Sequence, residues 1–198
     1  MKKLFVLLIV SCICICSCKK SNNSANSSNT VKQDTVYNEN IQSVFFDTPF
    51  GASKEEVIKK FKLHDFIPYT QTSSDALIHF HPIQSQKYSF GNMTWDMLDV
   101  GFVNGKFNYI RFMNASKDKV SAIQNYENVL SSVSAKYEMM EQVPEDTTFY
   151  KMSIAYSKVN RYVSVYCFRY ETISKEIRIG TVLEYLDRSF NNEVSDEL

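Results

Sequence analysis

The first 40 residues are unsuited to a packed core, and this confines the fold of the chain to the residues after position 40. Met-Lys-Lys opens the sequence, and the apolar run Leu-Phe-Val-Leu-Leu-Ile-Val comes directly after it. This pattern is typical of a secretory signal, and it is shorter than the roughly 20 residues that a membrane-spanning helix needs. The next stretch is rich in Ser, Asn and Lys, which bury too little apolar surface to offset the ordering cost. We therefore expect a cleaved leader over 1–17 and a flexible tether over 18–40.

The end of the leader carries a candidate modification site. Its cysteines alternate with single residues, a spacing that suits neither a disulfide framework nor a zinc site. They are Cys12, Cys14, Cys16 and Cys18. The segment Ile15-Cys16-Ser17-Cys18 resembles a bacterial lipobox, with an aliphatic residue three positions before the lipidated cysteine. Ile9-Val10-Ser11-Cys12 is a second candidate. We expect the lipid on Cys18, because that residue ends the apolar run and adjoins the polar tether.

The leader predicts an exported protein held at a membrane by its N-terminal lipid. Lys19 comes directly after the expected lipid site, and by resemblance to lipoprotein sorting in Gram-negative envelopes it favours the outer membrane. Three other interpretations stay open. They are a freely secreted protein, an uncleaved single-span anchor, and a lumenal protein retained by the C-terminal Ser-Asp-Glu-Leu, which resembles an endoplasmic-reticulum signal. We expect the lipid-anchored envelope protein.

Residues 41–188 have the length of one domain, and a polar tail over 189–198 comes after it. Without the two lysines of the leader the chain has 20 basic and 22 acidic residues, a net charge of −2. No basic stripe appears, so nucleic acid is not an expected partner. Cys167 is the only cysteine of the domain, which excludes a disulfide within it.

Periodicity predicts two helices and a series of strands. Ser53 and Glu56 form a capping box that opens a helix ending before Pro68. Apolar residues at gaps of three and four predict a long helix over 117–137. Asn104-Gly105 is a strong hairpin signal. Alternating residues predict strands over 76–81, 87–90, 94–103, 107–113, 138–143, 149–157, 161–170 and 176–186.

These elements predict an α+β fold with an antiparallel sheet of about eight strands. The segment Ala52–Val57 aligns with Ala115–Val120, and each copy opens a helix that about four strands follow. Either this is a tandem helix-plus-sheet repeat, or the similarity reflects residues that are common at helix starts. A repeat would give one long sheet with both helices on one face.

One segment resembles a known class of proteins. The run Phe-Asp-Thr-Pro-Phe-Gly-Ala-Ser-Lys-Glu-Glu-Val, within 46–61, is similar to the opening of a class of envelope lipoproteins. That class includes the accessory lipoproteins of the outer-membrane barrel-assembly machinery, and its tandem form is similar to β-lactamase inhibitor proteins. The resemblance implies a fold that binds other proteins, without a cofactor and without catalysis.

Candidate chemical sites are weak. His79 and His81 share one face of a predicted strand and could begin a metal site, but no third ligand is evident and a solvated strand face is the better interpretation. Cys167 alternates with valines and is expected to be a small buried hydrophobe. The sequence contains no nucleophile elbow, phosphate-binding loop or zinc-protease motif. We expect no enzyme, no cofactor and no metal site.

Aromatic residues offer the best candidate surface. One face of the 161–170 strand carries a set of rings, while valines and Cys167 occupy the other face. These rings are Tyr162, Tyr166, Phe168 and Tyr170. Trp95, which lies outside this strand, is a further candidate for the same surface. These rings form either a protein-binding surface or one side of a strand that is buried on both faces. We expect a non-catalytic module that binds an envelope protein. The alternative is a carrier or sensor for a small apolar or glycan ligand, with a cavity lined by the same rings.

Overall fold

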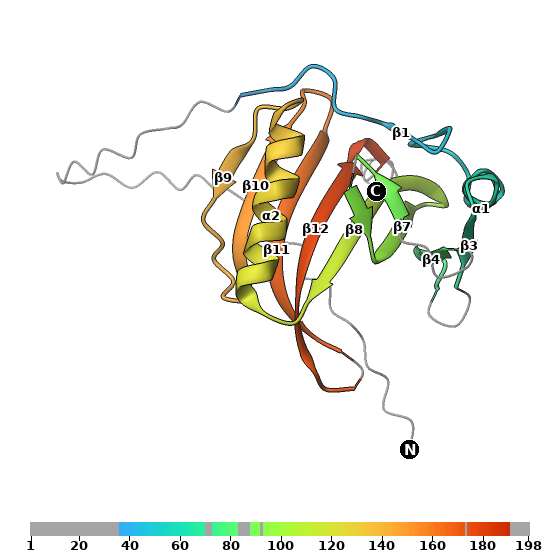
Figure 1. The fold of residues 1–198 in the computed structure, drawn as a ribbon. Helices are drawn as coiled ribbons and strands as arrows, with labels where there is room; N and C mark the ends of the chain where they lie inside the picture. The colour runs from blue at the N-terminus through green and yellow to red at the C-terminus, as the bar shows by residue number, and fades with distance from the viewer. Residues whose placement is uncertain (1–35, 70–72, 83–87, 92, 173, 191–198) are drawn as a thin grey trace, which may run out of the picture. The chain divides into compact units, whose positions relative to one another are not determined.

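A computed structural model describes residues 36–69, 73–82, 88–91, 93–172 and 174–190, all within one compact unit. The predicted lipid site at Cys18 and the C-terminal tail from 191 lie outside these residues. The described part contains two helices, an eight-stranded sheet and two short hairpins (Figure 1). The helices are α1 (Lys54–Leu63) and α2 (Lys119–Ser134). The strands of the large sheet are β3 (Phe66–Pro68), β4 (Leu77–Pro82), β7 (Met97–Val103), β8 (Lys106–Ser116), β9 (Met140–Gln142), β10 (Phe149–Tyr156), β11 (Arg161–Glu171) and β12 (Ile177–Asp187).

The order of the strands confirms the expected α+β architecture in two halves. Each half is a helix with four strands of the sheet after it, and every pairing is antiparallel. The spatial order is β3-β4-β7-β8-β12-β11-β10-β9, so the last strand of each half pairs with the other at the centre. The short strands β3 and β9 form the two edges, where brief strands limit pairing with other chains.

The two helices begin with different caps. The Ser53 hydroxyl accepts a hydrogen bond from the Glu56 backbone N–H at 3.2 Å, which confirms the predicted cap of α1. In α2 the cap is Asp118, whose carboxylate accepts from the Ser121 N–H at 2.8 Å. Ser116, which the repeat alignment matches to Ser53, is instead the last residue of β8. The repeat therefore holds for the order of elements and not for the residues that cap the helices.

One predicted strand was wrong, and two short features were not predicted. The first helix ends before Pro68 as predicted: α1 ends at Leu63, and the unpredicted β3 begins at Phe66 after Asp65, whose φ is 64°. The predicted strand 94–103 is divided at Asp96 into β6 (Met93–Trp95), which pairs with β5 (Tyr88–Phe90), and β7. A short pairing of β1 (Val44–Phe45) with β2 (Thr48–Pro49) precedes α1. Local periodicity missed these changes because each depends on where the chain turns.

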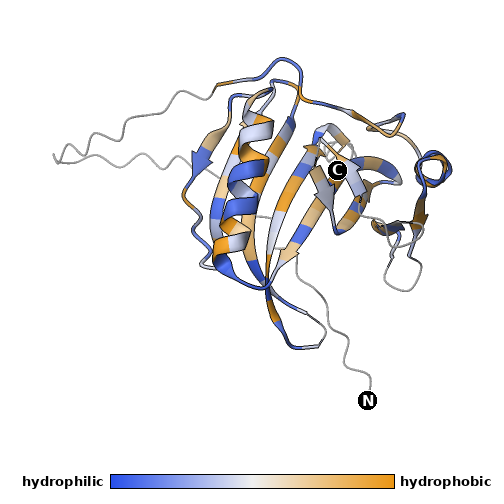
Figure 2. Ribbon diagram, in the orientation of Figure 1, coloured by the Kyte–Doolittle hydropathy of each residue, from blue (hydrophilic) through white to orange (hydrophobic). Residues whose placement is uncertain are grey.

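Both helices pack on one face of the sheet, which we call the helix face. Phe61 of α1 is fully buried and contacts the rings of Phe80 and Phe107. From α2, the Tyr126 hydroxyl forms a 2.7 Å hydrogen bond with Ser153 of β10, and the Ala122 carbonyl accepts one from Thr181 of β12. Figure 2 shows hydrophilic residues along the outer side of α2 and alternating hydropathy along the strands beneath it. This alternation is what a sheet with one buried apolar face requires.

Candidate functional site

The opposite face of the sheet carries four ionisable residues in one line across four strands. They are His79 on β4, Asp99 on β7, Arg111 on β8 and Glu184 on β12. Each is the register partner of the next, so their side chains project on the same face. We call this line the charge ladder and the face that carries it the ladder face. Neither described helix packs on this face, because α1 and α2 both lie on the helix face.

Asp99 is the centre of the charge ladder and is only 6% exposed. Its carboxylate accepts from His79 Nδ1 at 2.6 Å, and from the guanidinium of Arg111 through Nε, at 3.1 Å, and Nη2. Burial acts to raise the pKa of Asp99, but the hydrogen bonds and charges of His79 and Arg111 outweigh it and lower that pKa. Asp99 is therefore a buried carboxylate that is hydrogen-bonded by two neighbours.

Glu184 ends the charge ladder and has a different pKa shift from Asp99. Its carboxylate accepts a hydrogen bond from the Tyr166 hydroxyl at 3.1 Å. Burial raises the pKa of Glu184, against the opposing effects of Arg111 and Tyr166. Burial also raises the pKa of Tyr166 well above its usual value. Tyr166 thus links the charge ladder to the rings on β11.

Next to the charge ladder lies a group of aromatic side chains that we call the aromatic row. It comprises Phe149, Tyr166, Phe168 and Tyr170. Centroid distances of 5.5–5.9 Å join neighbouring rings of the row, and these are normal separations for favourable aromatic pairs. All four residues are half-buried. The row therefore combines fixed ring positions with remaining access to solvent.

The structure places the other predicted ring residues differently. Tyr162 lies on the ladder face but is buried, with the Arg188 guanidinium 4.7 Å above its ring. Burial raises the pKa of Tyr162 to about 12. Trp95 is completely buried and contacts Phe112 on the helix face. Including Trp95 in the expected surface was therefore wrong, because the break at Asp96 directs the indole into the core.

The remaining candidate residues occupy simple environments. His81 is exposed and contacts the Tyr69 ring at 4.4 Å. Cys167 is buried, as its alternation with valines predicts, and burial raises the pKa of its thiol. Within the described part of the chain, no three His, Cys, Asp or Glu residues are grouped so that they could hold a metal ion. The ladder face offers hydrogen-bonding groups and rings.

Sequence reasoning missed the charge ladder and Phe149. It identified His79 and His81 as a pair, yet only His79 joins the charge ladder. The pairing of Asp99 with Arg111 could not be predicted from the Asn104-Gly105 turn. A regular hairpin from that turn has a register one residue different from the observed one. Phe149 lies just before a register irregularity in β10, which alternation within one strand does not reveal.

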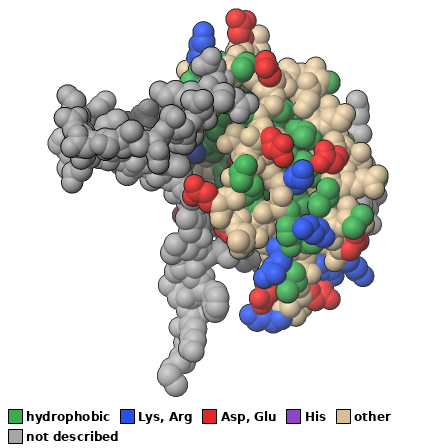
Figure 3. Space-filling model, turned by 90° about the vertical axis from the view of Figure 1, so that its left-hand side faces the viewer, with side chains coloured by type: hydrophobic (Ala, Val, Ile, Leu, Met, Phe, Trp, Pro, Cys, Tyr) green, Lys and Arg blue, Asp and Glu red, His purple; other side chains and the backbone are tan. Residues whose placement is uncertain are grey.

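Comparison with known proteins finds no matching family model, no matching curated protein and no matching solved structure. Figure 3, which views the molecule from the side of β9 in Figure 1, shows acidic and basic side chains interspersed on the visible surface. Such a mixed surface favours neither a nucleic acid nor another strongly charged partner.

Proposed function

We propose that this chain is a lipid-anchored lipoprotein of the bacterial cell envelope, held at the outer membrane, that binds an envelope protein without catalysis. The ladder face is the binding surface, and the aromatic row with the neighbouring charge ladder is the observation that carries the proposal. Residues 46–61 resemble the opening of barrel-assembly accessory lipoproteins and β-lactamase inhibitor proteins, and we include a protein-binding fold of that class in the proposal.

The composition of the ladder face supports a protein partner. Tyrosine and arginine are enriched among the residues that dominate binding energy at protein interfaces, because both combine a large contact area with hydrogen-bonding groups. Tyr166, Tyr170 and Arg111 lie together on this face, held by the contacts described above. A surface that is held in place before binding loses little conformational entropy when it binds. The face therefore suits a folded partner with apolar side chains that cover the rings.

The N-terminal sequence supports the proposed anchor. Among the described residues no helix has the length and apolar character needed to cross a membrane. A lipid on Cys18 would provide an attachment independent of the domain, since each buried methylene contributes about 0.8 kcal/mol. The tether between Cys18 and the domain would then allow the ladder face to reach a partner at the membrane.

Metabolic labelling with palmitate tests the anchor. We expect label in the wild-type chain and in Cys12→Ser, and its loss in Cys18→Ser. Cys12→Ser is the matched control, because it removes a thiol from the same leader while leaving the proposed site intact. Equal labelling of wild type and Cys18→Ser would contradict the proposed lipid site.

Site-specific photo-cross-linking in intact cells tests the binding surface. A photoreactive residue replaces Met152, which is half-buried and pairs with Tyr166 on the ladder face. The matched control replaces Val120 of α2, whose side chain is 77% exposed. We expect one protein adduct of defined size from position 152 alone, and its loss when Tyr170→Ala is added. The same adducts from both positions, or an adduct that is insensitive to Tyr170→Ala, would exclude the ladder face as the binding surface.

A further inference from the structure

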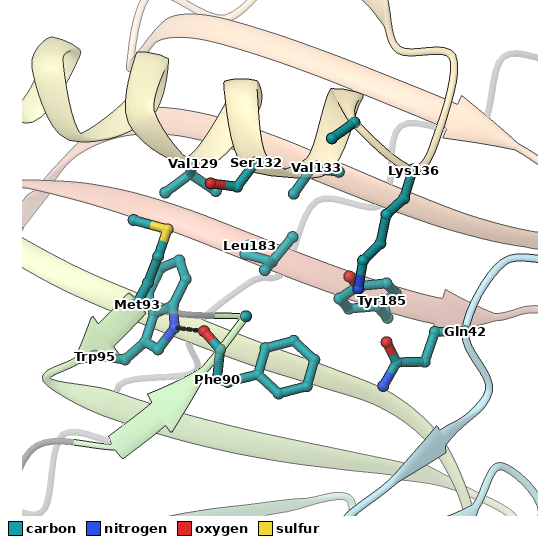
Figure 4. Close-up of a pocket in the computed structure, with 12 residues that line it drawn as sticks. Gln42, Phe90, Met93, Trp95, Val129, Ser132, Val133, Lys136, Leu183 and Tyr185 are labelled. Carbon is teal, nitrogen blue, oxygen red and sulfur yellow. Dashed lines mark hydrogen bonds between the residues drawn. The ribbon is translucent and has the colours of Figure 1, made fainter.

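The two faces of the sheet differ in the apolar surface that they leave to solvent. A depression on the helix face lies between α2 and the β5–β6 hairpin (Figure 4). The apolar side chains beneath it are closed to solvent, since Trp95 and Val129 are 0% exposed and Leu183 is 3% exposed. The four rings of the aromatic row, on the opposite face, are all half-buried and keep part of their surface in solvent.

Phe168 is the central ring of the aromatic row. Its centroid lies 5.9 Å from that of Phe149, 5.7 Å from that of Tyr166 and 5.5 Å from that of Tyr170. The rings of Phe149 and Tyr170 are each inclined by 30° to the plane of Phe168, whereas Tyr166 is inclined by 57°. Phe149, Phe168 and Tyr170 therefore form a strip in which each outer ring is close in orientation to the central one.

Gly180 of β12 makes room for the central ring of this strip. It is buried and is the register partner of Phe168. A Cβ at this position would lie 2.8 Å from Phe168 Cε1 and 3.0 Å from Met113 Sδ. The ring can lie there only because residue 180 has no side chain. Gly180 is therefore a positioning residue of the strip.

Charged groups beside the strip are already hydrogen-bonded within the domain. Glu184 accepts a hydrogen bond from a hydroxyl of the aromatic row. The Arg178 guanidinium donates from Nε to Glu176 at 3.0 Å. The Asp96 carboxylate accepts from the Ala115 backbone N–H at 3.0 Å. A charged side chain of a partner would lose its hydration here without gaining an unpaired counter-charge, so the strip favours an uncharged segment.

The backbone beneath the strip restricts the conformation of that segment. β11 pairs with β10 on one side and with β12 on the other, so a partner segment cannot join the sheet there. A polyproline II segment needs no such pairing, because water solvates its backbone and its carbonyls stay free. The Tyr170 hydroxyl, which forms no hydrogen bond with another described residue, can donate to such a carbonyl. The carbonyls of a helix are already used within the helix.

We propose that the strip binds an uncharged, proline-rich segment of the partner in the polyproline II conformation, with its prolyl rings on Phe149, Phe168 and Tyr170. Such segments dock on aromatic side chains at low entropic cost, because their conformation exists before binding. The inference rests on the proposed function, since it names the part of the partner protein that occupies the ladder face.

Fluorescence anisotropy of labelled decaproline, with the full chain in detergent micelles, tests the proposal. Decaproline is uncharged and forms a polyproline II helix, and a Gly-Ser repeat of the same length is the flexible control peptide. We expect saturable binding of decaproline alone. Tyr170→Ala should weaken it about ten-fold, as for a residue that dominates an interface. Tyr37→Ala is the matched control, because Tyr37 is 50% exposed and lies outside the row.

A pair of glycine substitutions tests the positioning of the strip. Gly180→Ala keeps all four rings but displaces Phe168, so it should also weaken decaproline binding about ten-fold. Gly101→Ala is the matched control, because it displaces the ring of Tyr109, which lies on the same face but not in the row. It should bind decaproline as the wild type does. Thermal unfolding confirms that both variants are folded.

Failure of this inference can be told apart from failure of the proposed function. Equal binding of the two peptides, no saturable binding of decaproline, or binding that survives Tyr170→Ala would overturn the proline-rich segment. If the chain still formed a Tyr170-dependent protein adduct from position 152, the ladder face would remain the binding surface and only the proline-rich segment would be refuted.

Discussion

The two faces of the sheet use the same strands for different purposes. On the helix face, aromatic and aliphatic side chains pack against α1 and α2, and residues such as Phe61 and Val165 are fully buried. On the ladder face, the strands carry a line of ionisable groups and a row of half-buried rings. The first face stabilises the fold through burial of apolar surface. The second is organised by hydrogen bonds and is proposed to bind a partner.

This difference predicts that substitutions on the two faces separate stability from binding. Apolar residues of the helix face should control the free energy of unfolding. Residues at the centre of the charge ladder should contribute to stability in a pH-dependent way. Rings of the aromatic row should matter mainly for the partner. Four substitutions test this separation.

The largest expected loss of stability comes from the helix face. Phe61→Ala should lower the free energy of unfolding by about 3–5 kcal/mol, because it leaves a cavity among the rings that Phe61 contacts. Leu63→Ala on the same helix is the control, since Leu63 is 74% exposed and should change stability by less than about 0.5 kcal/mol. Urea denaturation measures both. Similar losses at the two positions would contradict the packing of α1.

A smaller, pH-dependent loss is expected from the charge ladder. Asp99→Asn should cost about 2 kcal/mol at neutral pH, because it leaves Arg111 without its carboxylate partner. The pKa of Asp99 is lowered on folding, so its contribution is present above its ordinary pKa of 3.8 and is lost as pH falls through the folded value. The difference between wild type and Asp99→Asn in urea denaturation should therefore shrink between about pH 5 and pH 2.

Asp75→Asn is the matched control for this measurement. Asp75 pairs with Lys54 at 3.2 Å but is fully exposed, so its loss should change stability little at any pH. If Asp75→Asn and Asp99→Asn gave the same pH profile, the buried state of Asp99 would be refuted.

A close approach on the ladder face predicts the next effect. A Cβ at Gly101 would lie 1.9 Å from the ring of Tyr109, so Gly101→Ala must displace that ring. We expect a loss of about 1–2 kcal/mol, as for other overpacked sites. The same substitution in a Tyr109→Ala background should cost less, because the obstructing ring is gone. A double-mutant cycle of thermal unfolding measures the difference, and additive effects would exclude the contact.

The smallest effect on stability is expected in the aromatic row. Tyr170→Ala removes a half-buried ring and should cost about 1 kcal/mol or less. The same variant should strongly reduce the cross-link formed from position 152. A Tyr170→Ala chain that is clearly destabilised and still forms the cross-link would reverse the proposed roles of the two faces.

Most elements of the fold could be predicted from local sequence. The capping pair Ser53–Glu56 predicted the start of α1, and gaps of three and four predicted α2 to within a few residues. Alternation predicted the strands that form the large sheet, except for the three-residue β3. These features were readable because each depends on neighbours that are close in the chain. The break at Asp96 was not, since it depends on which strand pairs with Trp95.

The sequence by itself thus determined the helices, most strands and the apolar character of the helix face. The tertiary structure decided the charge ladder. The Asn104-Gly105 turn pairs Phe102 with Phe107, and a regular continuation would place Asp99 opposite Ile110. An irregularity after Gly101 shifts the register by one residue and places Asp99 opposite Arg111. A shift of one residue exchanges the two faces of a strand, so this single bulge puts the arginine beside the carboxylate.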